Sequence, residues 1–147
     1  MSHKLGMEGK LFRNAGTYAI PDWKEMKNVK DLTLTLEKGE ADLTTRGNAG
    51  WKATVGTLKE GSIEFEMVWD TEDAGFTAIK SAYFGNSLIG LAVMDGPIET
   101  SGNQGLWADC MITNFSRDEA LEEAITVKVT AKPTYSTNAP HWKTVGP

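Results

Sequence analysis

The sequence predicts a mainly β domain, built as a β-sandwich or partly closed barrel with one flanking α-helix. Two segments, residues 31–37 and 62–69, alternate apolar and polar side chains with a period of two, as half-buried strands do. One segment has the spacing of an amphipathic helix, and shorter alternating segments occupy much of the remaining chain. Strands therefore outnumber helices in the prediction.

The amino-terminal strands are predicted at residues 9–13 and 24–29, with turn residues such as Pro21 between them. The next strand, residues 31–37, reads D-L-T-L-T-L-E and places its three leucines on one face. Residues 62–69 repeat this pattern, so both strands are expected to bury one face and expose the other. The exposed polar face is predicted to include Thr33, Thr35, Glu37, Glu64 and Glu66.

A helix is predicted shortly after residue 70. Asp70 or Thr71 can cap its first turn, and a Gly-Asn pair at residues 85–86 supplies a left-handed stop. The spacing of the apolar residues places them on one face of this helix. These residues are Phe76, Ile79 and Tyr83.

The carboxyl-terminal half is predicted to form three strands, at residues 87–94, 106–113 and 123–132. Residues 1–6 are short and polar, and residues 135–147 contain Pro140, Gly146, Pro147 and several small polar residues, so both ends are expected to be flexible arms. The chain is thus interpreted as a single domain spanning residues 1–147.

Composition excludes several classes of protein. The chain has 147 residues and a net charge of −5, which argues against a protein that grips nucleic acid by neutralising phosphates. No apolar run approaches the ~20 residues of a membrane span. One cysteine and two histidines make an intrachain disulfide impossible and a zinc site improbable.

Residues suited to catalysis are sparse. His3 and His141 lie in the expected arms, and Cys110 falls on the apolar side of its strand, where a thiol is buried and unreactive. Glu64 and Glu66 share one polar strand face, which is more typical of a solvated surface than of a glycosidase cleft. We therefore expect no enzyme, and no catalytic, cofactor or metal site.

A long connection joins the two best strands. Residues 38–51 read K-G-E-A-D-L-T-T-R-G-N-A-G-W, and loops of this length are usually functional or disordered. Leu43, Arg46 and Trp51 stand among small residues, a composition typical of a segment that orders against a partner. A hairpin of this kind also leaves free strand edges, which pairing with neighbouring copies would cover.

The chain resembles the tail tube (major tail) proteins of long-tailed bacteriophages. The resemblance spans roughly residues 10–134. It rests on V-K-D-L-T-L-T-L-E-K-G-E-A-D-L-T-T-R-G-N-A-G-W-K-A-T at residues 29–54, S-I-E-F-E-M-V-W-D at 62–70 and A-G-F-T-A-I at 74–79.

This resemblance implies a tail-tube-like fold and hexameric rings that stack into a hollow tube through which DNA is ejected. Residues 31–37 and 62–69 would supply one inner hairpin, and residues 106–113 and 123–132 a second. Leu43, Arg46 and Trp51 would belong to an inter-ring loop. The lumen would be lined by Thr33, Thr35, Glu37, Glu64 and Glu66.

The same resemblance implies which partners and which location to expect. The partners would be further copies of the chain and the tape measure, baseplate and tail terminator proteins. DNA would pass through without specific binding, because an acidic wall repels a polyanion. The protein would reside in the virion tail after assembly in the host bacterial cytoplasm.

Two other interpretations remain open at the level of sequence. One is a monomeric carbohydrate- or protein-binding β-sandwich that uses Trp23, Trp51 and Trp107 as a stacking platform. The other is a hydrolase with paired carboxylates at Glu64 and Glu66.

Overall fold

We describe a computed structural model of the chain, which covers residue 6 and residues 9–119, 121 and 124–146. Apart from Gly6, the arm expected at residues 1–6 lies outside these described residues. The helix is α1 (Ala74–Phe84), and a short 3-10 helix, η2, spans Arg46–Asn48. The strands are β1 (Lys10–Asn14), β2 (Trp23–Glu25), β3 (Val29–Asp42), β4 (Thr54–Val68), β5 (Leu88–Met94), β6 (Gln104–Asp118), β7 (Thr126–Pro133) and β8 (His141–Thr144).

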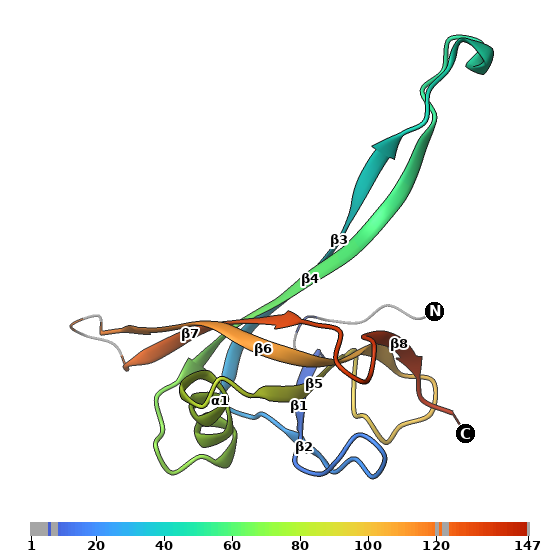
Figure 1. Cartoon of the computed structure of the whole chain (residues 1–147). Helices are drawn as coiled ribbons and strands as arrows, with labels where there is room; N and C mark the ends of the chain where they lie inside the picture. Colours follow the sequence, from blue (N-terminus) through green and yellow to red (C-terminus); the bar gives the residue numbers. More distant parts are fainter. Residues whose placement is uncertain (1–5, 7–8, 120, 122–123, 147) are drawn as a thin grey trace.

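The strands form one curled sheet in the order β2-β1-β5-β6-β7-β4-β3, and β8 pairs with β6. Every pairing is antiparallel. Figure 1 shows α1 against this sheet and the β3–β4 hairpin projecting far beyond it. The mainly β fold with a flanking helix is therefore confirmed, in its partly closed barrel form.

The long strand β6 joins the two halves of the sheet. Its amino-terminal part pairs with β5, whose first residue Leu88 lies opposite Met111. Its carboxyl-terminal part, from Cys110 onward, pairs with β7 on the other edge. As a result, β3, β4, β7 and the end of β6 form a four-stranded unit beyond the reach of β5.

The core lies between α1 and the concave side of the sheet. Phe76 and Ile79 of α1 are almost fully buried, as are Ile63 and Met67 of β4 and Val127 of β7. The ring of Phe76 contacts neighbouring aromatic rings, with its centroid 4.9 Å from that of Trp69 and 6.1 Å from that of Phe115. The alternating residues predicted to face inward on β4 thus form the centre of the core.

The cap of the helix lies three residues after Asp70, the first of the two predicted caps. Asp73 is the N-cap, and its Oδ2 accepts a hydrogen bond of 2.8 Å from the Phe76 N–H. Asp70 instead holds the preceding turn by accepting from the Glu72 N–H at 3.1 Å. The predicted stop is confirmed, since Asn86 has φ of 53° just after the helix.

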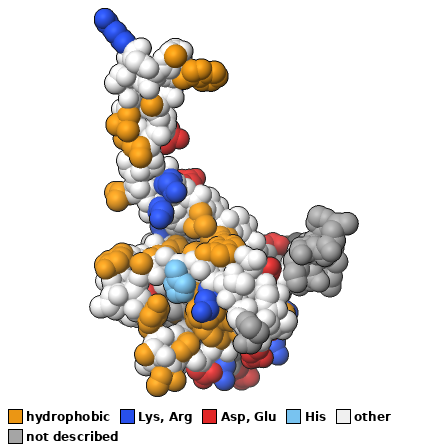
Figure 2. Space-filling view, turned by 90° about the vertical axis from the view of Figure 1, so that its right-hand side faces the viewer, with side chains coloured by type: hydrophobic (Ala, Val, Ile, Leu, Met, Phe, Trp, Pro, Cys, Tyr) orange, Lys and Arg blue, Asp and Glu red, His pale blue; other side chains and the backbone are white. Residues whose placement is uncertain are grey.

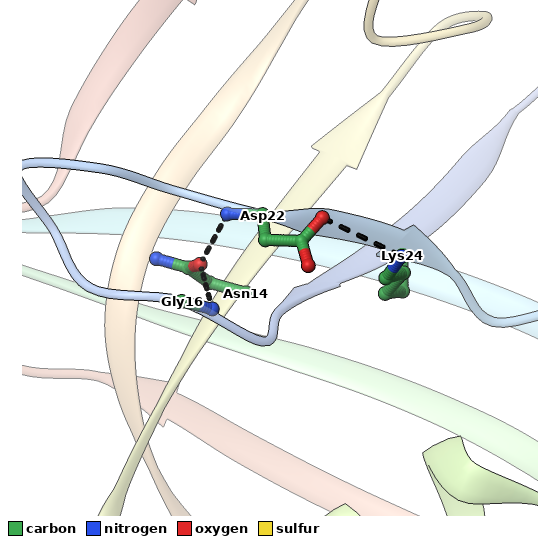
Figure 3. A network of polar contacts seen from close by, with 4 residues as sticks. All are labelled: Asn14, Gly16, Asp22 and Lys24. Atoms are coloured by element: carbon green, nitrogen blue, oxygen red, sulfur yellow. Dashed lines mark hydrogen bonds and ion pairs between the residues drawn. The ribbon is translucent and has the colours of Figure 1, made fainter.

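A polar network closes the connection between β1 and β2. Asn14 Oδ1 accepts hydrogen bonds from the backbone N–H groups of Gly16 at 2.8 Å and Asp22 at 2.9 Å (Figure 3). The Asp22 carboxylate lies 3.5 Å from Lys24 Nζ. One side chain therefore fixes both ends of this turn, as Asx side chains commonly do.

Several segments differ from their sequence-based expectations. Strand β4 begins at Thr54 and not at residue 62, β6 continues to Asp118 and not to residue 113, and the strand expected at residues 24–29 is divided between β2 and β3. Residues 38–42 continue β3 instead of belonging to a loop at 38–51, so the connection shortens to residues 43–53. The expected arm at 135–147 contains β8, which pairs His141 with Trp107 and Thr144 with Gln104. The extension of β3 depends on its pairing with β4, and β8 depends on its pairing with β6. The composition of each segment alone does not reveal such pairing.

Candidate assembly surfaces

The four-stranded unit presents one polar face. Directly opposed residues of antiparallel strands share a face, and Thr33 lies opposite Glu64, which in turn lies opposite Thr130. The neighbouring inward row contains Leu34, Ile63 and Ala131, all packed in the core. We call this polar surface the outer face. It consists of Asp31, Thr33, Thr35, Glu37, Glu60, Ser62, Glu64, Glu66, Asn114, Ser116, Lys128, Thr130 and Lys132.

All five side chains expected on this face are found there. Thr33, Thr35, Glu37 and Glu64 are exposed, and Glu66 is half-buried. The strands β6 and β7 add further residues to the face, among them Lys128 and Lys132 of the strand predicted at residues 123–132. Five carboxylates and two ammonium groups give the outer face a net negative charge. The position of Asn114 and Ser116 on either side of the apolar Phe115 is the sequence signal for this part of the face.

The four-stranded unit has two free edges. Strand β3 pairs only with β4 among the described residues, so its other edge is open. Beyond Met111, β6 pairs only with β7 within the same described set, so residues 112–118 are open on the side away from β7. Unpaired N–H and C=O groups on such edges template pairing with another chain.

The β3–β4 hairpin extends beyond the rest of the sheet as a two-stranded ribbon. The pairing of β4 with β7 starts only at Ile63, whereas the pairing of β3 with β4 continues to Asp42 and Thr54. Like charges lie directly opposite each other here, in the pairs Glu37–Glu60 and Lys38–Lys59. Such pairs destabilise an isolated ribbon.

The tip of the hairpin, residues 43–53, is a structured loop. Thr45 caps η2 through a capping box with Asn48, and Ala49 then adopts a left-handed φ of 53°. Hydrogen bonds from the Thr44 side chain and backbone, whose N–H lies 2.8 Å from Asp42 Oδ1, lower the pKa of Asp42. The loop therefore has a defined shape without any contact to a partner.

Apolar and basic side chains are exposed along this projection. Leu43 is 58% exposed and Trp51 is 79% exposed at the tip, and Leu58 is 85% exposed on β4. Figure 2 shows hydrophobic and Lys or Arg side chains over the projecting hairpin. Arg46 is also exposed, so the three residues singled out from the sequence lie together on one loop.

The structure does not bring together the residues of the two alternative sites, the tryptophan platform and the paired-carboxylate cleft. Trp23 and Trp107 contact each other with ring centroids 5.0 Å apart, but Trp51 lies at the hairpin tip, so the three tryptophans form no common platform. Glu64 and Glu66 lie on the open outer face.

Burial, with the charge of Asp109 as a smaller cause, raises the pKa of the Cys110 thiol to about 12.

Neither a metal-ligand cluster nor a membrane-spanning helix is found in the part of the chain that the structure describes. Within it, no group of three or more His, Cys, Asp or Glu side chains is arranged to hold a metal ion. Within the same residues, no helix has the length and apolar character needed to cross a membrane.

Comparison with protein families decides the identity of the chain. A family model described as phage tail tube protein matches residues 11–134. The chain belongs to the phage tail tube protein family. As a phage tail tube protein it is a structural component of the virion.

Solved structures show that this tail tube protein shares its fold with chains from a particle tail, a tail tube and a baseplate. The tail of an empty gene transfer agent particle matches with a TM-score of 0.74 and 12% identity, covering 96% of this chain and 99% of that one. The tail tube of SPP1 matches at 0.73 and 15% identity, covering 99% and 81%. The anti-feeding prophage baseplate matches at 0.61 and 10% identity, covering 99% and 95%. No curated protein sequence matches significantly.

Proposed function

We propose that this tail tube protein self-assembles into six-membered rings that stack into a hollow tube, through which DNA is ejected. The two free edges of the four-stranded unit carry this proposal. They lie on opposite sides of one sheet, so β3 of one copy can pair with residues 112–118 of the next. A head-to-tail contact of this kind closes into a ring without leaving an edge.

The six-fold symmetry is carried over from the gene transfer agent tail, which is described with C6 symmetry. In a closed ring of four-stranded units, the outer face defined above would line the lumen. The helix and the strands β1 and β5 would lie outside it, because their core residues pack against the opposite face of the four-stranded unit. Thr33, Thr35 and Glu37 of β3 and Glu64 and Glu66 of β4 are thus proposed to be lumen-facing.

A net negative lumen suits the passage of DNA. Carboxylates repel the phosphates, so the duplex slides through without specific binding. The hairpin tip with Leu43, Arg46 and Trp51 is proposed to contact the adjacent ring, since it projects beyond the ring to which its own sheet would belong. The tape measure, baseplate and tail terminator proteins would contact the assembled tube, and assembly would occur in the host bacterial cytoplasm.

Size-exclusion chromatography with light scattering and negative-stain microscopy of the purified chain tests the proposal. We expect rings with six-fold views, or tubes built from them. A protein that stays monomeric at high concentration and binds glycans would instead support the ligand-binding alternative.

A further inference from the structure

The charge of the chain is divided between two parts. Residues 38–59, which form the projecting ribbon and its tip, carry four of the 15 Lys and Arg but two of the 20 Asp and Glu. That segment therefore has a net charge of +2, and the remainder of this acidic chain totals −7. The tip itself, residues 43–53, has two basic residues, Arg46 and Lys52, and no acidic ones.

The cations of the tip have no partner within their own chain. No described carboxylate lies within 4.0 Å of the Arg46 or Lys52 side chain in an ion pair. Trp51, between them in the loop, is largely exposed. Aromatic and arginine side chains on a structured loop are the residues that most often anchor protein interfaces.

An acidic turn lies at the other end of the same strand. Strand β4 starts at the tip with Thr54 and ends in the body with Val68, about 46 Å away at 3.3 Å per residue. Asp70 and Glu72 follow directly, are exposed and form no ion pair with a described residue. Figure 1 shows the turn between β4 and α1 at the end of the body away from the hairpin tip.

Lys27 and Lys30 also occur near this end of β4, because the Val68 N–H donates to the Asn28 carbonyl. The turn at residues 70–73 itself contains three acidic residues and no basic one. Asp73 is occupied as the helix cap, and one carboxylate oxygen of Asp70 accepts the Glu72 N–H, which leaves the second Asp70 oxygen and the Glu72 carboxylate to meet a partner.

We infer that the basic tip of one copy docks against the acidic 70–72 turn of a second copy, head to tail along β4. Arg46 and Lys52 meet Asp70 and Glu72, while Trp51 is buried in the contact. The inference rests on the proposed stacking of rings and assigns the surface that receives the tip. Opposite charges at the two ends of one strand also give the stack a single direction, because tip-to-tip and turn-to-turn contacts repel.

The test uses charge reversal and rescue in the full chain. The first variant, Arg46→Glu with Lys52→Glu, is expected to form rings but to lower the fraction sedimenting as tubes by about tenfold or more. The second variant, Asp70→Asn with Glu72→Lys, is expected to do the same, and asparagine keeps the side-chain oxygen that holds the turn. All four substitutions together restore opposite charges and should recover tubes.

A matched control separates the contact from total charge. Lys24→Glu with Lys80→Glu makes the same change of net charge as the first variant, at two exposed sites, and should leave tubes intact. Circular dichroism confirms that each variant is folded. Tubes formed by the first variant, or failure of the fourfold variant to recover them, would overturn the inference. Absence of rings from the unmodified chain would instead overturn the proposed function.

Discussion

Glu66 on β4 lies directly opposite Lys128 on β7, on the outer face of the four-stranded unit. Lys128 in turn lies opposite Ser116 of β6. In the proposed lumen wall, the acidic side chains therefore come from the adjacent strands β3 and β4, and the basic side chains come from β7. Its net charge remains negative because five carboxylates outnumber two ammonium groups, so each Glu on β4 contributes strongly to the balance.

The first prediction concerns this balance. Glu64→Lys with Glu66→Lys makes the outer face net positive, and the variant should still form tubes because both side chains point away from the core. DNA ejection should slow or stall, since the wall would then attract phosphates. Ejection kinetics of assembled particles measure the effect, with Lys128→Glu as the control that makes the wall more acidic. Unchanged ejection in the lysine variant would show that these side chains do not face the lumen.

The second prediction concerns the tip. Replacement of residues 43–53 by Asn-Gly joins Asp42 to Thr54, which are already paired, through a favoured two-residue turn. The variant should keep the unfolding temperature of the parent chain but should not form stacked tubes. Full-length tubes in negative-stain images would contradict the proposed role of the tip.

The third prediction concerns the like-charged pairs of the ribbon. Lys59→Glu converts the Lys38–Lys59 pair into an opposite-charge pair directly across the hairpin. Amide hydrogen exchange of residues 36–42 and 54–60 should slow in the monomeric chain relative to the parent. Lys80→Glu on the helix makes the same change of charge and should leave these amides unaffected. Faster exchange in the Lys59 variant would contradict the register of the ribbon.

The fourth prediction concerns the core. Phe76 is 1% exposed and contacts the rings of Trp69 and Phe115, so Phe76→Ala leaves a cavity between α1 and the sheet. The free energy of unfolding should fall by about 3–5 kcal/mol in urea titrations. Lys80→Ala, an exposed position on the same helix, is the control and should change stability little. A loss below that of the control would show that α1 is not packed as described.

The fifth prediction concerns Cys110. Because burial raises its pKa to about 12, iodoacetamide at pH 8 should not label the folded chain, whereas urea-unfolded chain should react readily. The unfolded thiol has a pKa of about 8.5, so its contribution to stability is constant below that pH. That contribution is lost as pH rises from about 8.5 towards 12, and Cys110→Ala should remove this part of the alkaline destabilisation. Rapid labelling of the folded chain would contradict the burial.

Local sequence patterns predicted several elements because their causes are local. The alternation of Leu32, Leu34 and Leu36 predicted the strand, but only Leu32 and Leu34 are partly buried, and Leu36, in the projecting ribbon, is 54% exposed. The left-handed Asn86 ends the helix by its own backbone preference. The choice of Asp73 over Asp70 as the cap was not predictable, since both aspartates suit the position and the turn geometry decides between them.

The strand order and register that local patterns did not predict depend on pairing between different strands. The sequence determined the half-buried strands of one domain, the helix between two of them, and an exposed face with Thr33 and Glu64 on separate strands. Only the tertiary structure placed Lys128 opposite Glu66, paired β8 with β6, and extended β3 to Asp42. The physical reason is that strand register and sheet order depend on hydrogen bonds and packing between segments far apart in the chain, which periodicity within one segment does not encode.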